Sequence, residues 1–186
     1  MSLHAPALPA ARALALAAAL ALLPFAALEA QQADTTDVSS IDAIVAAVYD
    51  VISGPAEQPR DWARWHSLFI EGARLIPVGR NADGSVRHRV MTPADYASQS
   101  GPRLEQSGFF EREIGRVTEQ FGQIAHLFSA YESRRSLDDA EPFARGINSF
   151  QLVNDGTRWW VVSILWDSER PDNPIPSRYL TGRPGR

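Results

Sequence analysis

Residues 144–167 constrain the fold more than any other stretch, because they have the pattern of a long β-hairpin. Two runs rich in β-branched and aromatic residues flank Asn154-Asp155-Gly156, a turn sequence typical of hairpins. Three of the five tryptophans lie in the second run. The chain therefore contains an antiparallel strand pair whose two faces both carry large apolar side chains.

The register of this hairpin decides which side chains share a face. A three-residue loop at 154–156 pairs Val153 with Thr157. A two-residue turn would instead change which residues of the two strands share a face. We favour the three-residue loop because it separates polar from apolar groups. One face then carries Arg145, Ile147, Ser149, Gln151, Trp159, Val161, Ser163, Leu165 and Asp167, and the other carries Asn148, Phe150, Leu152, Trp160, Val162, Ile164 and Trp166.

Residues 1–30 have the three parts of a secretory signal peptide. Arg12 precedes an apolar run from Ala13 to Leu28, and small residues follow at Ala30. The run is shorter than the roughly 20 residues that span a bilayer, which favours cleavage over an uncleaved N-terminal anchor. We expect a periplasmic or secreted protein with no membrane attachment after processing.

The remaining chain divides into a flexible lead-in at 31–40, one domain at 41–170, and an irregular tail at 171–186 that is rich in proline and glycine. There are no cysteines, so packing alone must hold the domain together. The net charge of −4 is dispersed, which argues against a nucleic-acid partner. The absence of lysine excludes Schiff-base chemistry, and no motif indicates a cofactor.

The order of elements predicts an α+β domain in which three helices pack on one face of a curved antiparallel sheet. Apolar spacing indicates a helix at 41–52, and Asp61 can cap a second, aromatic helix. Thr92-Pro93-Ala94-Asp95 is typical of a capped helix start, with an expected end by Gly101-Pro102. Strands are expected at 73–78, 86–91, 109–121 and 124–133, before the closing hairpin.

Two segments in this order resemble the nuclear-transport-factor-2-like superfamily, which includes ketosteroid isomerases and SnoaL-like polyketide cyclases. They are Asp61-Trp62-Ala63-Arg64-Trp65-His66-Ser67-Leu68-Phe69, which precedes Ala73-Arg74-Leu75-Ile76-Pro77, and Asn154-Asp155-Gly156-Thr157-Arg158-Trp159-Trp160-Val161-Val162. The resemblance covers the mature chain in topology. It implies a cone-shaped domain whose bent sheet and three helices enclose an apolar pocket, with a homodimer formed through the opposite sheet face.

One position departs from the isomerase pattern. The general base of those enzymes is an aspartate directly before the proline of the first strand, and Ile76 stands there in this chain. Because Ile76 cannot accept a proton, we reject a ketosteroid isomerase as the specific function.

These observations predict an exported domain that binds a small apolar or aromatic ligand. Two alternatives stay open: an enzyme of the cyclase, isomerase or dehydratase kind that uses a pocket histidine or tyrosine, and a protein-interaction domain that uses the outer sheet face.

The polar hairpin face is expected to line the pocket with Arg145, Ser149, Ser163 and Asp167 as ligand-binding residues. Arg145 and Asp167 can form an ion pair, which we favour over an Arg145 that receives a ligand carboxylate. Trp62, Trp65 and His66 form either core or an aromatic lid over a flat ligand.

His126 and Tyr131 are the candidate catalytic residues. The ordinary pKa of a histidine suits proton transfer near neutrality, although a histidine packed in the sheet is the simpler interpretation. The two residues are five positions apart on one strand, so at most one faces the pocket. Glu111 and Glu113 share a face, but the neighbouring Arg112 and Arg116 favour an exposed, charge-balanced strand.

The histidines are too scattered and the acidic residues too dispersed to predict a metal site. The apolar hairpin face, with Trp160, Ile164 and Trp166, predicts a homodimer interface. In the alternative interpretation, the tail with Pro171, Pro174, Ile175 and Pro176 folds back over these tryptophans.

Overall fold

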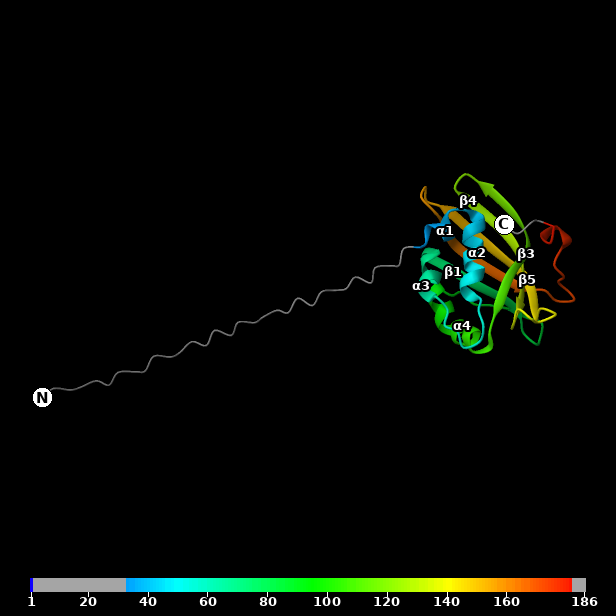
Figure 1. Ribbon diagram of the computed structural model, residues 1–186, viewed down its shortest axis with the longest axis horizontal. Coiled ribbons are helices and arrows are strands. Elements are labelled where there is room, and N and C mark those ends of the chain that lie inside the picture. Colours follow the sequence, from blue (N-terminus) through cyan, green and yellow to red (C-terminus); the bar gives the residue numbers. More distant parts are fainter. Residues whose placement is uncertain (2–32, 182–186) are drawn as a thin grey trace.

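The computed structural model describes residue 1 and residues 33–181, so the predicted signal peptide lies outside the described residues. The helices and strands follow the predicted order, with a short additional helix before the first predicted one (Figure 1). They are α1 Thr35–Val38, α2 Ile41–Ile52, α3 Trp62–Ser67, β1 Phe69–Arg80, β2 Val86–His88, α4 Pro93–Ser107, β3 Phe110–Phe121, β4 Ile124–Arg134, β5 Ala144–Asn154, β6 Trp159–Ser168 and the 3-10 turn η1 Ser177–Tyr179. Within residues 33–181 no helix combines the length and the apolar character that crossing a membrane requires.

The six strands form one sheet in the order β2-β1-β6-β5-β4-β3. All neighbouring pairs are antiparallel except β1 and β6, which run parallel, so the sheet is mixed and not purely antiparallel as predicted. The fold class is otherwise the predicted one: α+β, with the helices packed against the inner face of the sheet.

Helix α2 lies across this inner face and forms the centre of the core (Figure 1). Ser40 caps it, because the Ser40 Oγ accepts a hydrogen bond from the Ala43 N–H at 3.0 Å. Ile44, Val48 and Ile52 of α2 are buried together with Leu127 and Phe150 of the sheet. Each such side chain contributes about 1.5–3 kcal/mol through removal from water.

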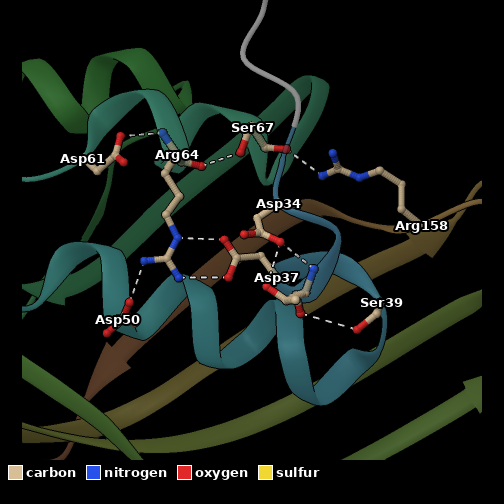
Figure 2. A network of polar contacts seen from close by, with 9 residues as sticks. Asp34, Asp37, Ser39, Asp50, Asp61, Arg64, Ser67 and Arg158 are labelled. Carbon is tan, nitrogen blue, oxygen red and sulfur yellow. Dashed lines mark hydrogen bonds and ion pairs between the residues drawn. The ribbon is translucent and has the colours of Figure 1, made fainter.

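Arg64 fixes α3 on the two preceding helices (Figure 2). Its guanidinium binds both carboxylate oxygens of Asp37 at 2.7 and 2.9 Å, and one of Asp50 at 2.6 Å. Asp37 belongs to α1, a helix that falls where the sequence predicted a lead-in without regular structure. The partner charge on Arg64 and the burial of Val38 explain why Thr35–Val38 is helical.

Helix α4 begins with the predicted capping box of Thr92 and Asp95. It does not end at Gly101-Pro102, as predicted, but continues to Ser107. Leu104 is buried on the pocket side, and Glu105 accepts hydrogen bonds from the Arg60 N–H and the Trp62 Nε1–H. These tertiary contacts outweigh the backbone hydrogen bond that Pro102 cannot donate.

The closing hairpin has a different register from the predicted one. Asn154 pairs with Trp159 across a four-residue loop, and a bulge interrupts β6 between Val161 and Ser163. The Asp155 carboxylate organises the loop, because it accepts hydrogen bonds from the Thr157 N–H, the Arg158 N–H and the Trp160 Nε1–H. These hydrogen bonds hold the pKa of Asp155 well below its ordinary value.

The bulge moves Trp159 and Val161 to the inner face, where they join Phe150 and Ile164 in the core. The predicted assignment of side chains to the two hairpin faces was therefore wrong between the bulge and the turn. The pattern alone could not reveal this, since one extra residue in β6 inverts every side chain that precedes it.

The described part of the tail lies on the outer face of β3 and β4. Tyr179 packs edge-on against Phe128 at 5.3 Å, and the backbone of Tyr179 and Leu180 lies against Gly115. A side chain at Gly115 would have no room, which explains a glycine in the middle of β3. The tail thus covers β3 and β4 instead of the tryptophans of β6.

Gly101 provides a test of the α4 packing. A Cβ at this position would lie 2.7 Å from the Trp62 Cζ2, and the Trp62 ring is held by Glu105. We expect Gly101→Ala to destabilise the protein by about 1–3 kcal/mol in urea unfolding, because overpacking outweighs the gain of about 1 kcal/mol in helix propensity. Ser98→Ala, at an exposed position of the same helix, should be nearly neutral. A Gly101→Ala protein as stable as the parent would contradict this account.

Candidate functional site

A cavity of about 470 Å³ lies between the inner face of the sheet, α2 and α4. Its walls are mainly apolar and aromatic. Trp65 stacks on Tyr96 with ring centroids 5.0 Å apart, and Trp166 meets Tyr96 edge-on at 6.2 Å. The Trp65 Nε1–H donates to the Pro93 carbonyl at 3.0 Å, so its polar atom is satisfied while its ring faces the cavity.

A compact polar cluster lies on the sheet side of this cavity. Glu111 of β3 accepts a hydrogen bond from the Ser133 Oγ–H at 2.8 Å and one from the Asn148 Nδ2–H at 3.3 Å. The three residues come from three adjacent strands, and all of them line the cavity. Burial raises the pKa of Glu111 to about 7, although the hydrogen bonds from Ser133 and Asn148 oppose this rise.

A second carboxyl group is connected to Glu111 by a chain of hydrogen bonds. The Ser129 Oγ–H donates to the Glu113 Oε1 at 2.6 Å, and the Tyr49 hydroxyl lies 2.7 Å from the Ser129 Oγ. Since the Ser129 hydrogen is used by Glu113, Tyr49 donates to Ser129 and in turn accepts from the Asn148 Nδ2–H at 3.0 Å. Burial also raises the pKa of Glu113 to about 7.

The prediction that Glu111 and Glu113 lie on an exposed strand was therefore wrong for both residues. Their side chains face inward because β3 passes beside α2, where the Ser53 Oγ joins the two elements through the Glu111 backbone. The neighbouring Arg112 faces the other side and pairs with Glu132 at 2.7 Å.

The two candidate catalytic residues lie on opposite faces of β4. Tyr131 lines the cavity, and burial raises its pKa to about 12, so it remains protonated at neutral pH. His126 is not among the residues that line the cavity. It lies on the outer face, where its ring meets Phe128 and its Nε2 is 3.4 Å from the Ser149 Oγ.

The predicted ligand-binding residues are divided in the same way. Trp65 lines the cavity, whereas Trp62 packs behind it with ring centroids 6.2 Å apart, and His66 is exposed. The polar hairpin face does not line the cavity: Ser149, Ser163 and Asp167 alternate with the inward-facing residues Asn148, Phe150, Ile164 and Trp166.

The predicted ion pair between Arg145 and Asp167 is also absent among residues 33–181. Arg145 pairs with Glu169 at 3.1 Å, and Asp167 pairs with Arg170 at 2.6 Å. The prediction that Arg145 pairs with Asp167 was therefore wrong, because the segment that follows β6 supplies another partner for each of the two residues.

The three residues of the predicted dimer interface do not share a surface. Ile164 is only 4% exposed and Trp166 lines the cavity. Trp160 lies on the outer face, beneath the Arg158 guanidinium at 3.6 Å. Homodimerisation itself stays a prediction.

Sequence reasoning missed Glu111 as a site residue, as well as Ser133 and Asn148. The sequence carried no direct signal for this cluster, because Glu111 lies opposite Ser133 only through a register shift in β3 between Glu113 and Gly115. Within the described part of the chain, no group of three or more His, Cys, Asp or Glu side chains is placed to hold a metal ion.

Comparisons with known proteins identify the fold and nothing finer. No family model matches the sequence, and no curated protein matches it. The chain is similar to a solved structure from Nostoc punctiforme with a cystatin-like fold, at 11% identity and a TM-score of 0.52 over 78% of this chain and 99% of that one. A cystatin-like protein from Caulobacter vibrioides is similar at 12% identity and a TM-score of 0.52, over 72% and 90%.

An NTF-2-like protein from Silicibacter pomeroyi is also similar, with 13% identity and a TM-score of 0.48 over 70% of this chain and 94% of that one. The two structures with a TM-score of 0.52 agree with the element order and the helix-covered inner face, and they confirm the predicted α+β fold. A shared fold at this level of sequence identity does not identify a function.

The raised pKa of Glu111 makes the stability of the protein depend on pH. The ordinary pKa of 4.5 applies in the unfolded chain, and the folded value is about 7. Between pH 4.5 and pH 7, Glu111 is protonated in the folded protein and ionised in the unfolded chain. The proton on Glu111 therefore stabilises the folded protein. This stabilisation is complete below pH 4.5 and is lost as the pH rises through 7.

We therefore expect the free energy of unfolding of Glu111→Gln, relative to the parent, to be about 2.5 kcal/mol higher at pH 8 than at pH 5 in urea titrations. Glu119→Gln is the control, because the Glu119 side chain on the same strand is 80% exposed. Parallel pH profiles for Glu111→Gln and the parent would show that burial does not hold the proton on Glu111.

Proposed function

We propose that this domain binds a small molecule with a flat apolar or aromatic body in the cavity between α2, α4 and the sheet. The observation that carries the proposal is the aromatic lining of a cavity of about 470 Å³ that contains one compact polar cluster. Binding sites for small molecules have this combination, because apolar walls supply affinity and a few polar groups fix orientation.

The cavity also has a mouth that a ligand can enter. Four of the residues that line it are exposed and lie beside the partly exposed Arg135, and we call these five the pocket mouth: Arg89, Gln99, Arg103, Arg135 and Phe143. The inner residues Trp65 and Phe150 are buried, so the cavity extends from solvent into the core.

Export of the protein is part of the proposal and rests on the sequence of residues 1–30. A signal peptide there would place the pocket in the periplasm or outside the cell, where it meets small molecules that have left or not yet entered the cytoplasm.

A second candidate function is an enzyme of the isomerase, cyclase or dehydratase kind. Glu111 favours it, because a carboxyl group with a pKa of about 7 on the wall of an apolar cavity can both donate and accept a proton at neutral pH. Glu111 replaces the predicted His126 in this role, and Tyr131 remains a hydrogen-bond donor in the same cavity.

Blocking the cavity tests the binding function. Ser100 lines the cavity from α4, so Ser100→Trp should fill it and weaken the binding of 2-naphthol, a neutral aromatic probe, by at least about 10-fold. Quenching of tryptophan fluorescence measures the affinity. Ser98→Trp adds the same ring at an exposed position of α4 outside the cavity and should bind like the parent. Equal affinities for the two variants, or no binding to the parent, would refute the proposed site.

Proton exchange tests the enzymatic candidate. The parent should accelerate exchange of the α-protons of 2-tetralone in deuterated buffer, followed by NMR, and Glu111→Gln should lose about 100-fold or more of this acceleration. Glu111→Gln should still bind 2-naphthol, because glutamine keeps the shape of the side chain. Exchange no faster than in buffer would reject the enzyme and leave the binding function standing.

A further inference from the structure

Three arginines converge on the pocket mouth from three separate segments of the chain. Arg89 lies between β2 and α4, Arg103 lies on α4, and Arg135 directly follows β4. Their positions in the sequence span almost fifty residues and follow no common motif, so the fold alone brings them together.

In the described part of the chain, these three guanidinium groups have no carboxylate in direct contact. Asp95 nevertheless lies near enough to Arg89, and Asp139 near enough to Arg135, for the arginine charges to add to the backbone hydrogen bonds that lower the pKa of these carboxyl groups. Within residues 33–181, none of them forms an ion pair. Arg135 donates to the Ser107 Oγ at 3.0 Å and lies 4.0 Å over the Phe143 ring, and Arg89 donates to the Met91 Sδ at 3.0 Å. Such neutral partners orient a guanidinium but leave its charge uncompensated.

Other arginines with buried or partly buried side chains are compensated in this protein. Arg116 pairs with Asp42 and Glu113, and Arg64 pairs with Asp37 and Asp50. Arg60, which is 7% exposed, donates to the carbonyl oxygens of Ile52, Gly54 and Leu104. The arginines of the pocket mouth differ from Arg116 and Arg64 in having no carboxylate partner among the described residues, and they are the basic residues that line the cavity.

The charge of the cavity is reversed relative to the whole chain. The net charge of the protein is −4, yet among the described residues Glu111 is the only acidic one that lines the cavity, against Arg89, Arg103 and Arg135. A local positive field at the entrance of an apolar cavity attracts anions and raises their local concentration.

We infer that the ligand of this pocket is an organic acid, with an aromatic body that lies among Trp65, Tyr96 and Trp166 and a carboxylate held by Arg89, Arg103 and Arg135. Guanidinium groups suit this role because their planar donors match the two oxygens of a carboxylate. This inference rests on the proposed binding function and adds the charge of the ligand to it.

A matched pair of probes tests the charge directly. 2-Naphthoate and 2-naphthamide have nearly the same shape and differ by one negative charge. We expect the full chain to bind 2-naphthoate at least about 10-fold more tightly than 2-naphthamide in 20 mM salt, and this ratio to shrink in 500 mM salt, where exposed charges are screened.

Variants then assign the preference to the pocket mouth. Arg89→Gln, Arg103→Gln and Arg135→Gln should each weaken 2-naphthoate binding by about 5-fold or more and leave 2-naphthamide binding unchanged. Arg87→Gln is the control, because Arg87 is exposed on β2 and does not line the cavity. Far-UV circular dichroism and unfolding curves confirm that each variant is folded.

The outcomes separate this inference from the function on which it rests. Equal affinity for the two probes, or an equal loss in Arg87→Gln and the three pocket variants, overturns the organic acid and leaves a neutral-ligand pocket. Failure of 2-naphthoate, 2-naphthamide and 2-naphthol to bind overturns the pocket function itself.

Discussion

The hydrogen-bond chain from Glu113 to Glu111 is the interaction on which the arrangement of helix and sheet depends. Its members come from α2, β3, β4 and β5, so it joins the central helix to three strands. Each hydrogen atom in it has one acceptor, and a buried polar network stabilises a fold only when it is satisfied in this way. Tyr49 is the essential member, because its hydroxyl is the only contribution from α2.

The same network sets the chemistry of the cavity. Asn148 donates its two amide hydrogens to Tyr49 and Glu111. The second hydrogen bond fixes the orientation of the Glu111 carboxyl relative to the cavity. The surroundings of that carboxyl are otherwise apolar, and the neutral donors Ser133 and Asn148 cannot offset the loss of water around a charge. Stability and reactivity are thus linked at Glu111, since the burial that raises its pKa also costs stability once the group ionises.

Local sequence patterns predicted the elements well, since their signals lie within a few residues. The apolar spacing of 41–52, the capping box at Thr92 and the turn at 154–156 each correspond to an observed element. The orientation of side chains was less predictable. A bulge near Val162 is decided by the packing of Trp159 and Val161 beneath α2, and this is not visible in the hairpin sequence.

The predicted roles of Gly101, Glu111 and Glu113 were wrong for a related reason. Gly101 resembles a helix stop in sequence, but its role is to admit the Trp62 ring, which approaches from a helix some forty residues earlier. Glu111 and Glu113 resemble a solvated strand because arginines surround them in the sequence, and only the position of α2 shows that they face the core. In both cases a distant segment determines the environment of the residue.

The inferred ligand and the state of Glu111 constrain each other. A carboxylate held by the arginines of the pocket mouth shares the cavity with Glu111, and two negative charges in an apolar space repel. The bound anion therefore favours the protonated form of Glu111, whose pKa already lies near 7. A carboxyl group in that form begins a reaction by donating a proton, so an enzyme built on this site would act first as a general acid, with a rate that falls as the pH rises through the pKa of Glu111. A general base would show the opposite dependence, which makes the pH profile of proton exchange the measurement that separates a dehydratase-like order of steps from an isomerase-like one.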